Sequence, residues 1–229
     1  MALCGSGKVM WEDRTQKHHS DFLDYGDVDG DGRVELVYDH EGCAAAKGPI
    51  YVVEPLTGKI ETQIDYREQG VAHAQNVALG NFDGNSPGLE VAFCEKGRNV
   101  LMFDSSGTLL WKRPVPASLL SRGDWNGDGT EDILAFGLGA NVDGMFSVWS
   151  GTGERLYAIS FLPSPSKRTW SDRHNGGSWS HAMPGGHEGI RRQVDLDGNG
   201  RADVIMPFGA WHWGSDAILF LMEGPTVLE

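Results

Sequence analysis

The chain has 229 residues, of which 40% are hydrophobic, so it is long and apolar enough to bury a core. Its formal net charge of −13 argues against a nucleic-acid-binding protein, and no apolar run reaches the roughly 18 residues that cross a bilayer. The 32 glycines and 8 tryptophans are typical of many short strands joined by tight turns, so we expect an all-β fold.

Four acidic loops repeat along the chain, and each runs directly into an apolar stretch that we predict to be a strand. The repeats span residues 27–37, 81–91, 124–134 and 195–205, and the second contains one inserted residue. Their first residues lie 54, 43 and 71 residues apart. This period suits one four-stranded sheet per repeat, with connections of variable length.

Oxygen-bearing side chains stand at positions one, three, five and nine of these loops, with the last of them shifted by the insertion in the second. Alternate side chains of a tightly curled loop can converge on one point, and Ca²⁺ takes six to eight oxygen ligands. Glycines at positions four and six permit the backbone angles of such a curl. The predicted Ca²⁺ ligands are Asp27, Asp29, Asp31, Glu35, Asn81, Asp83, Asn85, Glu90, Asp124, Asn126, Asp128, Asp132, Asp195, Asp197, Asn199 and Asp203. The alternative is a set of Asp-Gly hairpin turns that bind no metal.

An EF-hand is excluded, because its loop needs a bidentate Glu at position twelve between two helices. Position twelve is Tyr38, Ala135 or Met206 in the three uninterrupted loops. The repeats instead resemble the FG-GAP, or integrin-type, calcium-binding β-propeller repeat, in which a calcium loop joins the innermost strand of a blade to the second. This resemblance implies one propeller domain over residues 1–229, with about four blades of four antiparallel strands each.

The blade boundaries follow from the positions of the loops. We predict blades at residues 18–66, 73–113, 117–161 and 187–223. Their third and fourth strands are expected at 49–54 and 59–66, at 99–103 and 108–112, and at 145–149 and 154–161. Residues 3–11 match 103–111 in pattern, so residues 3–13 should form an extra outer strand. Either this strand completes the last blade of a small ring, or the chain is a piece of a seven- or eight-bladed propeller whose exposed edges favour association.

The three cysteines, Cys4, Cys43 and Cys94, are odd in number and far apart, so no disulfide framework follows. Burial as small apolar residues is the first interpretation. A Cys43–Cys94 bridge, or a soft-metal site with His40, remains open.

Histidine stands eight residues before the first ligand in three of the four repeats, as His19, His73 and His187. In a propeller these positions start the innermost strand, so they would ring the mouth of the central channel opposite the calcium loops. Connections expected at the same mouth contain Arg173 and the candidate substrate-binding residues Trp170, Trp179, His181, Trp211, His212 and Trp213. Tryptophan stacks on sugars, arginine pairs with carboxylates and histidine transfers protons near neutral pH, so the predicted partner is an acidic glycan. Purely structural roles are the alternative for the histidines and the tryptophans.

Residues 73–83 and 87–91 resemble a motif of propeller polysaccharide lyases, namely the family 11 rhamnogalacturonan lyases and related rhamnose–glucuronate lyases. The resemblance implies calcium-dependent β-elimination on a uronic-acid-containing polysaccharide. It also implies a secreted protein, extracellular or periplasmic, although no signal peptide is found. It makes His73 the candidate base, and His187, His19 and Arg173 candidates for the acid and the carboxylate clamp. The alternative is a non-catalytic, integrin-like calcium-binding module that holds a glycan or a protein.

Overall fold

A computed structural model describes residues 2–13, 20, 22–39, 48–71, 74–95, 97–117, 119–136, 145–160, 182–184, 195–210 and 218–222. Within these residues the protein is all-β, apart from one 3₁₀ helix, η1 (Tyr66–Gln69). No helix in this part of the chain is long and apolar enough to span a membrane.

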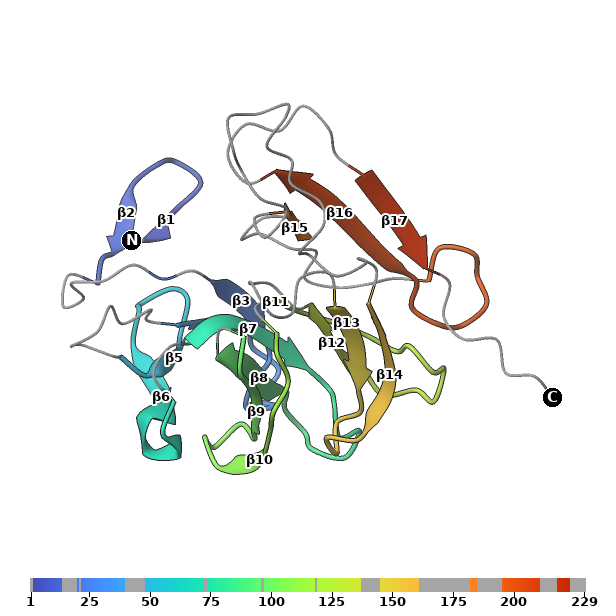
Figure 1. The fold of residues 1–229 in the computed structure, drawn as a ribbon. Helices are drawn as coiled ribbons and strands as arrows, with labels where there is room; N and C mark the ends of the chain where they lie inside the picture. The colour runs from blue at the N-terminus through green and yellow to red at the C-terminus, as the bar shows by residue number, and fades with distance from the viewer. Residues whose placement is uncertain are drawn as a thin grey trace.

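Three antiparallel sheets of four strands follow one another along the chain (Figure 1). Blade 1 contains β3 (Leu23–Gly26), β4 (Glu35–Tyr38), β5 (Ile50–Val53) and β6 (Ile60–Ile64). Blade 2 contains β7 (Ala74–Gly80), β8 (Glu90–Glu95), β9 (Asn99–Phe103) and β10 (Leu109–Arg113). Blade 3 contains β11 (Leu119–Gly123), β12 (Asp132–Phe136), β13 (Met145–Trp149) and β14 (Arg155–Ser160). The strands of each sheet pair in chain order, as in propeller blades, so the predicted fold class is confirmed for this part of the chain.

A fourth sheet and a separate hairpin complete the described residues. Blade 4 contains three described strands in chain order, β15 (Ala182–Pro184), β16 (Val204–Ala210) and β17 (Ile218–Met222). β15 lies upstream of the boundary predicted at residue 187, and it pairs with the far end of β16, with Ala182 opposite Ala210. Residues 2–11 form an antiparallel hairpin of β1 (Ala2–Leu3) and β2 (Val9–Trp11), and β2 lies within residues 3–13, where the extra outer strand is expected.

The outer strands lie close to their predicted bounds because glycine turns fix where each hairpin reverses. β9 and β13 have the predicted bounds, and their neighbours differ by one or two residues. Gly107 and Gly153 adopt φ values of 85° and 77° in these turns, a conformation that favours glycine. The largest difference is at β6, which stops at Ile64 because Asp65 caps η1 by accepting a hydrogen bond from the Arg67 N–H.

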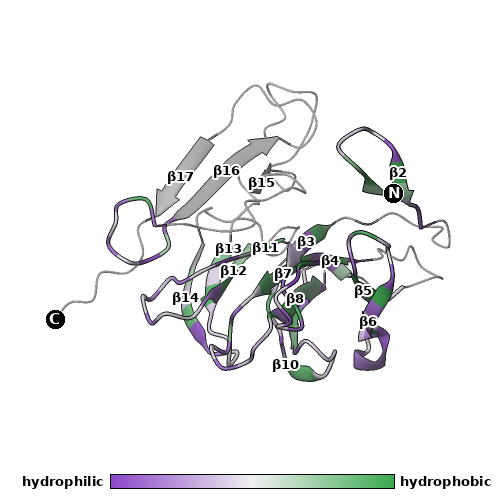
Figure 2. Cartoon of the chain, turned by 180° about the vertical axis from the view of Figure 1, so that it is seen from behind, coloured by the Kyte–Doolittle hydropathy of each residue, from purple (hydrophilic) through white to green (hydrophobic). Residues whose placement is uncertain are grey.

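The hydrophobic core lies between the blades, because each sheet buries its faces against its neighbours. One cluster joins residues of blade 1, such as Ile50, to residues of blade 2, such as Phe93. A second joins Met102 of blade 2 to Ile133 of blade 3. Figure 2 shows this pattern as hydrophobic colour on the central strands and hydrophilic colour on η1 and the outer loops. β7 and β8 are buried along their whole length, which makes blade 2 the centre of the described structure.

Candidate metal-binding loops

Each acidic loop lies at the junction of the first and second strands of its blade. The first three join β3 to β4, β7 to β8 and β11 to β12, and the fourth precedes β16. Gly30 and Gly32 in the first loop have φ values of 78° and 87°, and the equivalent glycines of the other loops are also left-handed. The predicted curl of the backbone is therefore present in all four loops.

The carboxylate at position nine is buried in every loop, and one of its oxygens closes the loop. Each accepts a hydrogen bond from the backbone N–H at position two. The four pairs are Val28–Glu35 (2.8 Å), Phe82–Glu90 (2.7 Å), Trp125–Asp132 (3.0 Å) and Leu196–Asp203 (2.8 Å). This contact leaves the second oxygen of each carboxylate available to a ligand inside the loop.

Three buried carboxylate oxygens in these loops have no hydrogen-bond partner among the described residues. They are Oδ1 of Asp27, Oε1 of Glu90 and Oδ1 of Asp203. A buried anionic oxygen is strongly destabilising unless a hydrogen-bond donor or a cation approaches it. The loops therefore contain acceptor groups that a bound cation would satisfy.

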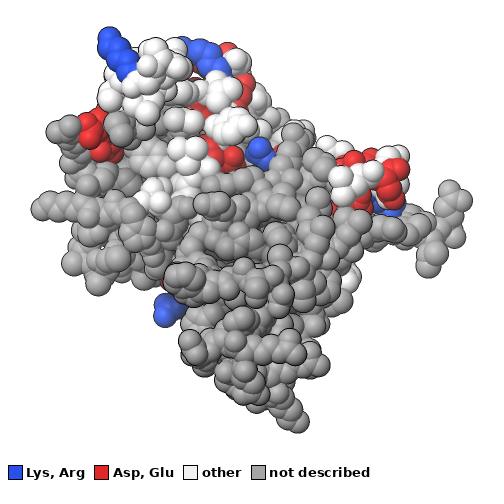
Figure 3. All heavy atoms as spheres, turned by 90° about the horizontal axis from the view of Figure 1, so that it is seen from above, with Lys and Arg blue, Asp and Glu red and all other residues white. Residues whose placement is uncertain are grey.

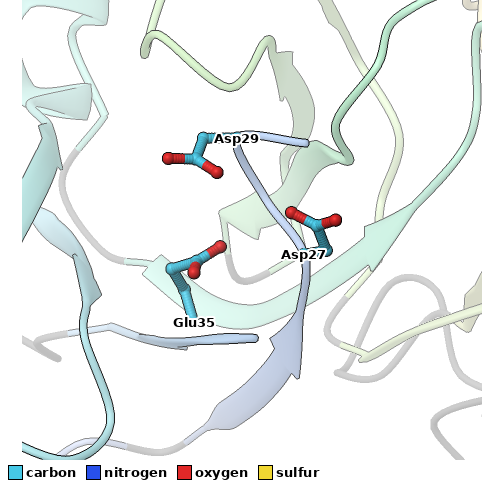
Figure 4. A group of neighbouring side chains, drawn as sticks. All are labelled: Asp27, Asp29 and Glu35. Carbon is cyan, nitrogen blue, oxygen red and sulfur yellow. The ribbon is translucent and has the colours of Figure 1, made fainter. Parts of the chain in front are cut away.

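In two loops the structure brings three carboxylates together. Ligand oxygens of Asp27, Asp29 and Glu35 in the first loop lie within 4.8 Å of one another, and Figure 4 shows these side chains around the curl. The same holds for Asp195, Asp197 and Asp203 in the fourth loop, which projects at one side of the molecule (right in Figure 3). Like charges at this separation repel, so the arrangement favours a cation.

The predicted ligand Asp31 does not join the first group. The Arg33 guanidinium donates to Asp31 Oδ2 from Nε at 2.8 Å, and a second contact from Nη2 makes an ion pair. These hydrogen bonds hold the pKa of Asp31 below its ordinary value. The side chain therefore faces Arg33, a donor two residues further along the chain.

The predicted ligands of the second and third loops use much of their bonding capacity within the loop. Asp83 accepts from the backbone N–H groups of Asn85 (2.7 Å) and Ser86 (2.9 Å) and from the Ser86 hydroxyl (2.8 Å). In the third loop, the amide of Asn126 donates to Asp128 at 2.8 Å. The first and fourth loops, which have carboxylates at positions one, three and nine, contain the carboxylate clusters found among the described residues.

In the first three loops, burial makes a negative charge at position nine costly. It raises the pKa of Glu35 and of Glu90, in each case against the lowering effect of backbone N–H donors. It raises the pKa of Asp132 to about 7, and the carboxylates of Asp128 and Asp124 add to this increase. A cation in the loop would offset this cost, so the acidic groups and a metal ion suit each other.

Two polar residues join the blades and were not singled out from the sequence as functional residues. Asp24 of β3 accepts a hydrogen bond from the backbone N–H of Leu79 in blade 2 (3.1 Å). Asn76 of β7 accepts one from the backbone N–H of Leu120 in blade 3 (2.7 Å). Both are polar residues at positions of an innermost strand that are expected to be buried. This was the sequence feature that could have identified them.

The candidate catalytic and substrate-binding residues lie outside the described part of the chain. The catalytic candidates are His73, His187, His19 and Arg173, and the substrate-binding candidates are Trp170, Trp179, His181, Trp211, His212 and Trp213. Cys43 and His40 also lie outside it. Cys94 is a free thiol buried in β8, where burial raises its pKa, as the interpretation as a small apolar residue predicts.

Comparisons with known proteins find likeness of fold at low sequence identity. No protein-family model and no curated protein matches the chain. The structure of BBS1N in complex with ARL6DN aligns with a TM-score of 0.52 and 12% identity, over 89% of this chain and 54% of that chain. The Bacillus licheniformis rhamnogalacturonan lyase PL11 and the rhamnogalacturonan lyase YesW both align with TM-scores of 0.49. Their identities are 13% and 16%, over 87% and 90% of this chain and 40% and 38% of theirs.

The chain thus spans about half or less of the length of these three proteins. At 12% identity the first alignment describes a shared fold, consistent with a partial β-propeller, and assigns no activity.

Proposed function

We propose that the chain is a Ca²⁺-binding portion of a β-propeller, in which cations held by the acidic loops fix the blades against one another. The observation that carries the proposal is the buried carboxylate at position nine of all four loops. Each uses one oxygen to close its loop, and unpartnered oxygens on Glu90 and Asp203 are left inside.

The donor set favours Ca²⁺ over other common metal ions. The loops offer carboxylate, amide and backbone carbonyl oxygens, and they contain no histidine or cysteine. Zinc sites are dominated by nitrogen and sulfur ligands, and Mg²⁺ requires a near-ideal octahedron. Ca²⁺ accepts six to eight oxygens in irregular geometry, including water, which suits a curled and partly exposed loop.

Calcium titration monitored by thermal melting tests this function. A site filled at 100 times its dissociation constant adds about 2.7 kcal/mol to stability, so the melting temperature should rise with Ca²⁺ and fall with a chelator. Native mass spectrometry should count the ions. Identical melting in both media, with no ion detected, would refute the proposal.

The second loop should fill last. It has two carboxylates, Asp83 and Glu90, together with the neutral Asn81 and Asn85, whereas the first loop has four carboxylates. Fewer negative ligands give weaker Ca²⁺ binding. Glu90→Gln should therefore change the weakest step of a calorimetric titration, and Glu35→Gln a tighter one.

For the whole protein of which this chain forms at least a part, we propose calcium-dependent lyase activity on a uronic-acid-containing, rhamnogalacturonan-like polysaccharide, in an extracellular or periplasmic location. This proposal is supported by the resemblance of residues 73–91 to propeller lyases. His73 would remove the C5 proton of the uronate and Arg173 would pair with its carboxylate. His187 or His19 would protonate the departing O4, so that a C4–C5 double bond replaces the C4–O4 bond. Bound Ca²⁺ would supply positive charge that neutralises carboxylates.

A non-catalytic glycan- or protein-binding module is the second candidate, and one observation favours it. Asn76, Asp83 and Glu90, three polar residues of the lyase-like motif, all make structural hydrogen bonds. The catalytic content of the motif therefore depends on His73.

The ultraviolet absorbance of the unsaturated uronate product separates the two candidates. A lyase should release this product from pectic polysaccharides, and His73→Ala should abolish it. His18→Ala removes a histidine that is not a candidate catalytic residue, so this control should keep the activity. A binding module should show no product and should keep its affinity for the glycan in both variants. Calcium binding is measured separately, so failure of the activity assay leaves the metal sites testable.

A further inference from the structure

Consecutive blades are joined by a repeated backbone hydrogen bond between their acidic loops. The N–H at position eight of one loop donates to a carbonyl at position one or two of the loop before it. The three bonds are Leu89 to Val28 (3.1 Å), Glu131 to Asn81 (3.1 Å) and Ala202 to Asp124 (2.6 Å). Each loop thus has a donating side that faces the preceding blade and an accepting side that faces the following one.

A glycine at position four lies beneath the next loop at each of these junctions. A Cβ atom on Gly30 would lie 2.5 Å from the Pro87 carbonyl oxygen, and one on Gly84 would lie 2.6 Å from Thr130 Cγ2. At Gly127 the nearest atom would be Arg201 Cγ, at 3.1 Å. The accepting side is therefore a close-fitting surface that the next blade covers.

Blade 4 presents this accepting side uncovered. Its position-two residue, Leu196, is 52% exposed, whereas Val28, Phe82 and Trp125 at the same position are buried. Its position-four residue, Gly198, has no atom within 4 Å of an added Cβ. Its position-one and position-two carbonyls accept no hydrogen bond from another described residue.

Blade 1 presents the donating side uncovered. Leu23 and Tyr25 of β3 are 49% and 63% exposed, whereas Val77 and Leu79, at the same register in β7, are fully buried against blade 1. Arg33 occupies position seven, where Arg201 packs on Gly127, and its side chain is 75% exposed. An apolar sheet face and the Arg33 guanidinium, which also pairs with Asp31, are thus both exposed on this side of blade 1.

We propose that a second copy of this chain occupies these surfaces, with blade 1 of each copy packed against blade 4 of its partner. Both surfaces are exposed, so they do not pack against each other within one chain. A second copy supplies a donating side for blade 4 and an accepting side for blade 1. Arg33 would then lie over the partner's Gly198, beside acidic groups of opposite charge. Two copies of these four blades give eight, the upper end of the usual range for propellers, which is compatible with a closed ring of two copies.

Complementary variants of the full chain test this arrangement. Tyr25→Asp alters the donating side and Leu196→Asp the accepting side, and Leu110→Asp, on an exposed residue of β10, is the matched control. Light scattering after size exclusion gives the mass of each in saturating Ca²⁺. Leu23→Asp replaces Tyr25→Asp if circular dichroism shows that the latter is unfolded.

We expect twice the chain mass for the wild type and for Leu110→Asp, and a monomer for each of the other variants alone. An equimolar mixture of Tyr25→Asp and Leu196→Asp should recover a dimer, because one of its two interfaces is then unmutated. A dimer that packs the same side of both copies against each other would not be restored by mixing. That result would overturn the proposal. A monomeric wild type would also overturn the proposal. If Tyr25 of that monomer is protected from oxidative footprinting, the chain's own blade 4 covers it and no second copy is needed.

Discussion

Asp132 provides a direct test of the view that the buried loop carboxylates are destabilising until a cation binds. This residue is buried at the start of β12, where Oδ2 accepts the Trp125 N–H at 3.0 Å. Burial raises its pKa from 3.8 to about 7 in the folded, metal-free chain. Because the folded pKa is the higher one, the charge costs nothing below about pH 4, and the cost is complete above about pH 7.

The size of this cost follows from the shift in pKa. A rise in the pKa of Asp132 from 3.8 to about 7 corresponds to roughly 4 kcal/mol as an upper limit. Water entering the partly exposed loop screens the charge, so about 2 kcal/mol is expected, which is roughly 4–8 °C in melting temperature for a chain of this length.

Asp132→Asn removes the charge and keeps an acceptor oxygen for the Trp125 N–H. At pH 8 in chelator, the variant should therefore melt above the wild type, and this difference should vanish below about pH 4. In saturating Ca²⁺ the order should reverse, because the variant has lost an anionic ligand. Glu61→Gln, an exposed change on β6, should show no reversal. A variant less stable than the wild type in both media would show that the charge stabilises the fold without a cation, and would refute the reasoning.

Two further predictions concern the contacts between blades. Gly151→Ala should cost about 1–3 kcal/mol in urea denaturation, because its Cβ would lie 1.8 Å from the Phe82 carbonyl oxygen, whereas Gly5→Ala meets open space and should change nothing. Asn76→Ala should cost about 1–3 kcal/mol, because it leaves the Leu120 N–H without its side-chain acceptor, and wild-type stability in that variant would show that the N–H finds another acceptor.

The blade architecture could be predicted from the sequence because its signals are local. Turn glycines such as Gly107 and the apolar run of β9 together define a hairpin to within a residue. The acidic loops were placed correctly between first and second strands for the same reason. The start of blade 4 was predicted less closely, because the register of His187 placed it at residue 187, whereas β15 lies at Ala182–Pro184.

The convergence of the ligands could not be predicted from spacing alone. Asp31 stands at a ligand position, yet the neighbouring Arg33 donor holds its carboxylate. Asp83 is held by Ser86, which stands where the other loops have glycine. Competition from donors two or three residues away depends on side-chain geometry, and the one-letter pattern does not contain this geometry.

The loop geometry gives a physical reason why the proposed metal binding would depend on the same residues as blade packing. In the second loop, the peptide unit between Asn81 and Phe82 donates its N–H to Glu90 and accepts the Glu131 N–H of blade 3 through its carbonyl. The third loop repeats this arrangement, with the peptide before Trp125 bonded to Asp132 on one side and to Ala202 of blade 4 on the other.

Hydrogen bonds in such a chain polarise one another, so the carboxylate charge strengthens the acceptor that the next blade uses. A cation on the second carboxylate oxygen would hold that carboxylate in its charged form and fix its position. The cation would thus act one peptide away from the junction between blades. The carboxylate at position nine therefore links its own loop to the neighbouring sheet, and the proposed metal would bind the same carboxylate.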